Sequence, residues 1–196
     1  MQHDCRCYKC KSVIYAMLFK IYDDVLFCPK FEEVSVELEK YKGKQFYDSL
    51  SRIYNSLVDY KGPGDFVQRK TLYDSDLYIP SGKILIETDE LQHFSEARRI
   101  ALNNYPEGFV CGYNFKAYKQ MCEKINSNSP SRQNRNVQRA WYDTIRDFLP
   151  MICPDKVKNV VRIPLGGYKW CDLSHKKKSD IAAFKRLLKS DDIWLK

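Results

Sequence analysis

The chain has 196 residues, a formal net charge of +8 and a pI near 9.0. With 44% hydrophobic and 14% aromatic residues it is suited to a folded domain and not to a disordered chain. No stretch approaches the ~20 apolar residues of a membrane span, and the start lacks a secretory signal pattern, so we expect an intracellular protein without a membrane partner. A basic chain favours polyanions, of which nucleic acid is the commonest.

In chain order, the first predicted element is a small Cys-rich segment over residues 1–30, with one apolar run at 13–19. Apolar spacing predicts helix over 31–60, interrupted at Gly43 and ended by the turn at 62–64. Short strands are predicted at 66–68 and 77–79. After the turn signal Pro80-Ser81-Gly82, residues 83–88 form a short aliphatic run that predicts a buried strand.

The second half alternates helices and strands. Ser95 is placed to cap a helix over 96–102, and a strand at 109–113 and a helix at 117–125 follow. A polar connector at 126–136 precedes a helix that Pro150 ends, a strand at 160–164 and an amphipathic helix at 176–189. This order predicts an α/β fold with a mixed central sheet flanked by helices.

The most informative segment runs from Asp76 to Asp89. Side chains alternate along a strand, so Glu87 and Asp89 share one face, and Glu87 follows an aliphatic run that is normally buried. The turn at 80–82 can fold the strand at 77–79 back beside it, which brings Asp76 near the other two acids. Three converging carboxylates would form an oxygen-rich site for Mg²⁺ or Mn²⁺. The alternative is a surface hairpin whose acids are solvated.

This segment resembles the core of the PD-(D/E)XK nucleases, in the branch near the very-short-patch-repair endonucleases. The resemblance covers about 20 residues closely, through an Asp, a turn, an apolar strand, then Glu-x-Asp followed by Gln-His, here at positions 76, 84–86, 87, 89, 92 and 93. It implies a restriction-endonuclease-like fold with metal ligands Asp76, Glu87 and Asp89. The chain departs from the family in having Glu90 where Gly is usual and Asp89 where the family has Lys.

Further site residues follow from this resemblance. The family often has an acid near the start of the preceding helix, and Asp48 is the nearest candidate in this chain. His93 is a candidate general acid or base, or a ligand of a metal-bound water, and Gln92 a candidate for orienting a phosphate or that water. The alternative for His93 is a hydrogen-bonded structural residue.

Under this resemblance the chain divides into a Cys-rich segment (1–30), a nuclease core (31–125), the polar connector (126–136) and a C-terminal part packing on the core (137–196). The N-terminal segment also holds a candidate zinc site, in which the Cys7–Cys10 spacing suits a zinc knuckle and Cys5 or His3, together with Cys28, would complete it. The alternative is that these cysteines are free structural thiols.

Several arginines are candidates for binding a nucleic-acid backbone. Two of them open the helix after the acidic strand, and three recur at helical spacing near the connector: Arg98, Arg99, Arg132, Arg135 and Arg139. Together with the net charge they favour phosphate contacts, although each alone is typical of a solvated helix face.

The sequence therefore predicts a divalent-metal-dependent nuclease that hydrolyses phosphodiester bonds, with DNA favoured over RNA by the resemblance. Two alternatives remain open. One is a non-catalytic nucleic-acid-binding protein on a decayed nuclease fold, and the other is a zinc-stabilised interaction module.

Overall fold

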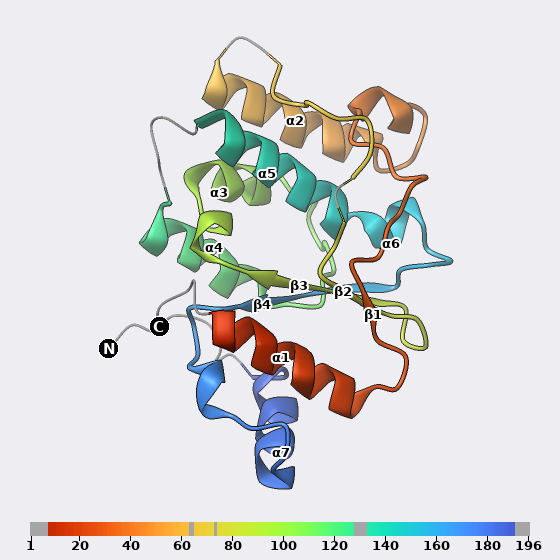
Figure 1. Ribbon diagram of the computed structural model, residues 1–196. Helices are drawn as coiled ribbons and strands as arrows, with labels where there is room; N and C mark the ends of the chain where they lie inside the picture. Colours follow the sequence, from red (N-terminus) through yellow and green to blue (C-terminus); the bar gives the residue numbers. More distant parts are fainter. Residues whose placement is uncertain (1–7, 63–64, 73, 128–132, 191–196) are drawn as a thin grey trace.

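The computed structural model describes residues 8–62, 65–72, 74–127 and 133–190, and its centre is a four-stranded sheet (Figure 1). The strand order is β1-β2-β3-β4, with bounds Leu26–Phe27, Leu77–Ile79, Ile84–Asp89 and Asn159–Pro164. The pairs β1–β2 and β2–β3 are antiparallel, whereas β3–β4 is parallel. The predicted mixed sheet flanked by helices is confirmed.

The β2–β3 hairpin forms as the turn signal predicts. The N–H of Lys83 donates to the carbonyl of Pro80 at 3.0 Å, and Lys83 takes the left-handed conformation with φ +51°. Strand β3 is buried on both faces after its first residue. Alternation puts Glu87 and Asp89 on one face and Thr88 on the other.

One face of the sheet is covered by α1 (Tyr8–Ile21) and α7 (Lys178–Leu187), as Figure 1 shows. The helix α1 buries four side chains at helical spacing, Cys10, Ile14, Met17 and Leu18. The apolar run at 13–19 therefore belongs to a helix of 14 residues. A short 3₁₀ helix, Trp170–Asp172, packs against α1 on this side.

The opposite face carries two layers of helices (Figure 1). Helix α5 (Gln133–Asp147) lies between the sheet and α2, which forms the outer layer, and α3 and α4 lie beside it. The bounds of the remaining helices are Tyr47–Lys61 for α2, Glu96–Asn103 for α3, Phe115–Ile125 for α4 and Leu149–Ile152 for α6. From Trp141 to Leu149 every side chain is buried, including two acids and an arginine.

Several predicted elements have different bounds or are absent. The helix expected over 31–60 is reduced to a 3₁₀ turn, Leu38–Tyr41, and to α2, and Gly43 with φ +82° lies in the interruption. Residues 66–68 and 109–113 join no strand of the sheet, so the two strands predicted there are wrong. Ser95 caps α3 as predicted, because its hydroxyl accepts the N–H of Arg98 at 3.2 Å.

Segments 1–30, 31–125 and 137–196 all contribute side chains to one hydrophobic core. The sheet itself joins all three, since β1 pairs with β2 and β4 pairs with β3 along six residues. The C-terminal strand thereby fixes the position of β3, on which two of the predicted site residues lie.

Candidate functional site

The candidate site lies where β2 begins and β3 ends. Leu77 pairs with Ile86 in the antiparallel ladder, so Asp76, one residue before β2, comes opposite Glu87. Residues opposite each other in such a ladder hold their Cβ atoms about 4.5–5.5 Å apart. The hairpin thus sets the backbones of two of the three predicted site residues opposite each other, and the charge of Asp76 contributes to the raised pKa of Glu87.

Asp76 is held in place by α1 and by β3. The Lys11 ammonium donates to its Oδ1 at 2.8 Å, and the N–H and hydroxyl of Thr88 donate to its Oδ2, the N–H at 2.8 Å. Burial alone would raise the pKa of Asp76, but the hydrogen bonds from Lys11 and Thr88 outweigh it and lower that pKa. Asp76 is therefore a carboxylate at neutral pH.

Lys11 and Thr88 were not among the predicted site residues. Lys11 comes from the helix that the sequence interpretation did not recognise, and its side chain is 30% exposed. Lys11 is the ammonium group that the fold places on Asp76. If residues 8–21 had been predicted as a helix, Lys11 would have been placed next to the buried Cys10, at the edge of the buried face of that helix.

Glu87 is buried, with only 6% of its surface exposed. It forms an ion pair with the Arg146 guanidinium, whose Nε lies 3.3 Å from Glu87 Oε1. This contact lacks hydrogen-bond geometry, and Oε1 has no hydrogen-bond partner in the structure. Burial raises the pKa of Glu87 to about 7, although Arg146 opposes the rise. Glu87 is thus a buried carboxyl group with an unsatisfied oxygen.

Asp89 is fully buried and its oxygens are occupied. Arg162 on β4 donates to both of them at 3.1 Å, and the Tyr118 hydroxyl donates to Oδ2 at 2.8 Å. Asp89 therefore lies in an ion pair with Arg162, on the same face of β3 as Glu87. Among the described residues, no group of three or more His, Cys, Asp or Glu side chains is arranged to hold a metal ion.

Two aspartates of α5 extend this ion pair into a network. Arg162 Nε donates to Asp147 Oδ1 at 2.9 Å and its Nη2 donates to the carbonyl of Asp143 at 3.1 Å. Asp147 also accepts from Arg98, and from the hydroxyls of two tyrosines at 2.9 and 2.7 Å, Tyr105 and Tyr113. Burial would raise the pKa of Asp147, but Arg162 and Arg98 outweigh it and lower it. A buried charge cluster of this kind is tolerated only when every member is paired.

His93 connects the network to the surface. Its Nδ1 lies 2.9 Å from Asp143 Oδ2 and 3.5 Å from Asp89 Oδ1, and its side chain is 18% exposed. Burial opposes the charged ring, but Asp143 and Asp89 outweigh it and raise the pKa of His93 above its ordinary value. The predicted assistant Gln92 is exposed, and its amide donates to Glu90 Oε2 at 3.1 Å.

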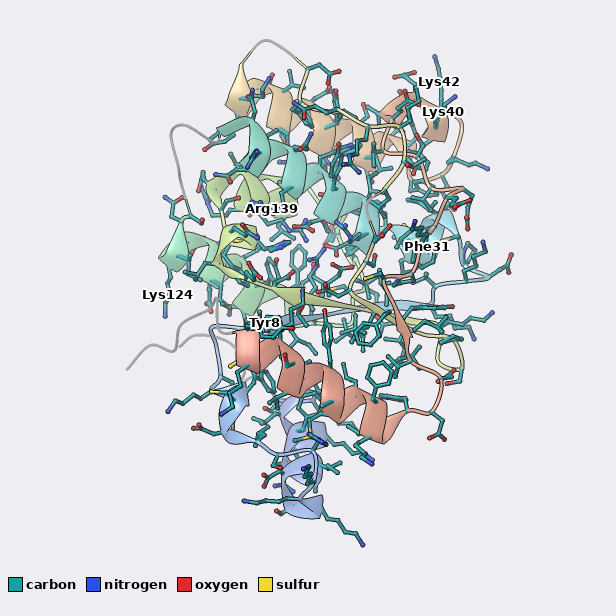
Figure 2. The ribbon with its side chains drawn as sticks, in the orientation of Figure 1. Tyr8, Phe31, Lys40, Lys42, Lys124 and Arg139 are labelled. Carbon is teal, nitrogen blue, oxygen red and sulfur yellow. The ribbon has the colours of Figure 1, made fainter. Side chains whose placement is uncertain are left out.

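The arginines predicted to contact phosphates are distributed differently. Arg98 is buried against Asp147, so its guanidinium is directed into the core. Arg99 pairs with Glu96 at 2.8 Å. Arg135 is exposed on α5, and Arg139 donates to the carbonyl of Gln92 at 3.0 Å, above the sheet in Figure 2. Arg132 lies outside the described residues.

Asp48 and the cysteines lie elsewhere. Asp48 is exposed in the first turn of α2, in the layer separated from the sheet by α5 (Figure 1). Cys10 is buried in α1 and Cys28 is exposed after β1, whereas Cys5 and Cys7 lie outside the described residues. The helix that faces Asp76 offers Lys11 in place of the expected acid.

Comparison with known proteins finds no family model, no curated protein and no solved structure that matches this chain. None of the described helices is both long enough and apolar enough to cross a membrane. The interpretation of the site therefore depends on its own geometry.

Proposed function

We propose that the chain is a divalent-metal-dependent nuclease whose metal ligands are Asp76 and Glu87. The observation that carries this proposal is the pair itself. Asp76 comes opposite Glu87 in the register of the hairpin and its charge contributes to the raised pKa of Glu87, whose Oε1 is buried without a hydrogen bond. A buried unsatisfied carboxyl oxygen costs on the order of 1–3 kcal/mol or more, unless a ligand binds it.

The donor set fits a hard cation. Mg²⁺ and Mn²⁺ prefer carboxylate oxygens, and Mg²⁺ is usually held by one or two of them with water completing its shell. Asp76 is ionised at neutral pH and Glu87 has a pKa of about 7, so a cation has only one proton to displace. Asp89 is left out of this ligand set because Arg162 and Tyr118 occupy it.

When bound, such a metal supplies activation of water and stabilisation of the phosphoryl and leaving oxygens. The residues of the chain do the rest. Lys11 fixes the carboxylate of Asp76 and places a positive charge beside the reacting phosphate. Asp143 holds His93 by Nδ1, which leaves Nε2 as the nitrogen that exchanges a proton with substrate or solvent. The mixed sheet with helices on both faces supports a restriction-endonuclease-like fold as part of this proposal.

The proposal is tested by cleavage and by metal binding. The purified protein should cut DNA with Mg²⁺ or Mn²⁺, and EDTA should stop the reaction. Asp76→Asn and Glu87→Gln should remove cleavage and weaken Mn²⁺ binding in calorimetry. Asp24→Asn is the matched control, because this aspartate is hydrogen-bonded to Ser81 in the turn at the far end of the hairpin. Cleavage that persists in EDTA, or in Asp76→Asn, would refute the assignment.

One observation favours a second candidate, a non-catalytic nucleic-acid-binding protein on the same fold. Arg146 lies 3.3 Å from Glu87 and could hold that carboxylate permanently as an ion pair. On that candidate, wild-type protein binds DNA and shows no Mn²⁺ binding that depends on Glu87. Calorimetry of wild type against Glu87→Gln therefore separates the two.

A further inference from the structure

The helix α1 carries a row of aromatic and basic side chains on its outer side. Tyr8, Lys11, Tyr15 and Phe19 follow one another at intervals of three, four and four residues. Residues at these intervals lie on one face of a helix, one above the other. Phe27 of β1 joins the row, and we call these five residues the α1 stripe.

The contacts along the α1 stripe are continuous from the candidate metal ligands outward. Lys11 is bound to Asp76 at 2.8 Å and lies over the Tyr15 ring, 5.6 Å from its centroid. The ring centroids of Tyr15 and Phe27 are 5.3 Å apart, and those of Phe19 and Phe27 are 4.9 Å apart. Tyr8 lies in the first turn of α1, at the end of the stripe opposite Phe19 and Phe27 (Figure 2).

Three rings of the stripe are exposed to solvent. Tyr8 is 85% exposed, Phe27 is 55% and Phe19 is 41%. Exposed apolar groups that are contiguous mark a binding surface more often than isolated ones do. The ligand of this surface should offer flat apolar faces to the rings.

The charge of α1 indicates that this ligand is an anion. Its 14 residues include Lys9, Lys11 and Lys20 and no acid. Aspartates follow only beyond the helix end, and one of them, Asp24, is bound to the turn at Ser81. Within the stripe Lys11 is paired with Asp76, and the exposed Lys9 and Lys20 lie on the neighbouring face of α1. Aromatic rings beside lysines are the combination that binds single-stranded nucleic acid, where bases stack on the rings and the cations contact phosphates.

We propose that the α1 stripe binds single-stranded nucleic acid and guides it to Asp76. The inference rests on the proposed nuclease function, for which it specifies the substrate class. From Tyr8 to Phe19 the helix rises about 16 Å, at about 1.5 Å per residue. A strand with about 3.4 Å between successive nucleotides spans this length with roughly five of them. Bases in a duplex already stack on one another, so only unpaired bases can use the exposed rings.

The experiment measures binding without cleavage. Fluorescence anisotropy of a labelled single-stranded oligonucleotide of about 12 nucleotides, and of its duplex, is recorded with the full chain in EDTA. Tyr8→Ala and Phe27→Ala should each weaken binding of the single strand roughly five- to a hundredfold, the range expected when one base loses its aromatic partner. Binding of the duplex should change by less than about twofold, and Tyr8→Phe should retain wild-type affinity because a phenyl ring still stacks.

Val110→Ala is the matched control, since Val110 is 84% exposed and lies outside the α1 stripe. It should leave both affinities unchanged. The proposal is overturned if wild type binds no single strand, or if the ring substitutions weaken single strand and duplex equally. It is also overturned if they leave affinity unchanged but dissociate an oligomer in size-exclusion chromatography, which would make the stripe a protein interface. Because EDTA suppresses metal-dependent cleavage, the assay reports binding alone. It therefore tests the stripe whether or not the chain proves to be a nuclease.

Discussion

Replacing Glu87 by Gln tests the electrostatics of the site most directly. Glu87 is 6% exposed, and burial raises its pKa from 4.5 to about 7. A group whose pKa is raised on folding binds its proton more tightly in the folded state. Its stabilising contribution is therefore complete below about pH 4.5 and is lost as the pH rises through about 7. At about 1.4 kcal/mol per pKa unit, the loss approaches about 3 kcal/mol by pH 8.

The assay is urea unfolding in EDTA at pH 5 and pH 8. Between these values the free energy of unfolding of wild type should fall by up to about 3 kcal/mol more than that of Glu87→Gln, because glutamine has no proton to lose. Glu123→Gln, an exposed position on α4, should follow the wild type. Saturating Mg²⁺ at pH 8, near a hundred times its dissociation constant, should restore about 2.7 kcal/mol to wild type and nothing to Glu87→Gln.

An equal pH dependence in wild type and Glu87→Gln would refute the reasoning, since it would mean that Glu87 keeps an ordinary pKa inside the fold. If the unfolding free energies of wild type and Glu87→Gln differ with pH as expected but Mg²⁺ stabilises neither, the raised pKa of Glu87 is supported and the metal site is rejected.

Three other predictions concern the network and the surface. Arg162→Met should lower the unfolding free energy by about 3–5 kcal/mol, or the melting temperature by roughly 6–20 °C, because it removes the arginine that pairs with buried Asp89 and Asp147. Arg186→Met on the exposed side of α7 should stay within about 0.5 kcal/mol in the same melts. His93→Ala should lower the free energy of unfolding by about 1–3 kcal/mol at pH 5.5 and by less at pH 8.5. The pKa of His93 is raised in the fold, so its ring stabilises the fold while protonated and this contribution is lost as the pH rises. An equal loss at both pH values in urea titrations would contradict this. DNA affinity measured from 50 to 200 mM salt should fall steeply, and reversing the charge at Arg135 and Arg139 should weaken all DNA sequences alike and flatten that dependence.

Local signals predicted the hairpin and several helix ends well. The turn at 80–82 and the aliphatic run before Glu87 fixed β2 and β3, and Ser95 marked the start of α3 because a hydroxyl at that point satisfies a free N–H. The helix α1 went unrecognised although its buried residues recur at helical spacing, since the neighbouring cysteines suggested a metal-binding segment. The strand expected at 109–113 failed for a different reason. A short apolar run predicts burial, but Val110 is 84% exposed and none of residues 109–113 is fully buried.

The network around α5 was beyond the reach of local signals. Asp89 and Arg162 are 73 residues apart and come together only because β4 pairs with β3. The sequence does not show which residue such a charge will pair with. Asp89 was therefore interpreted as a metal ligand from its place on the strand and the resemblance, and Arg98 as a phosphate contact from its place at a helix start. Alternation along β3 correctly predicted that Glu87 and Asp89 lie on one face. The side chains that contact them there come from elements far along the chain.

Burial of these arginines means that other cations must supply the attraction for nucleic acid. The network holds three arginines and four carboxyl groups, namely Arg98, Arg146 and Arg162 with Glu87, Asp89, Asp143 and Asp147. More acid than base is thereby removed from the surface, and the rest of the chain is at least as basic as the formal charge of +8 indicates. The attraction for a polyanion therefore comes from exposed cations such as Lys9, Lys20 and Arg135. Two of these three belong to α1, the helix that also presents Lys11 to Asp76, so the basic surface and the candidate metal ligands are joined by a single element.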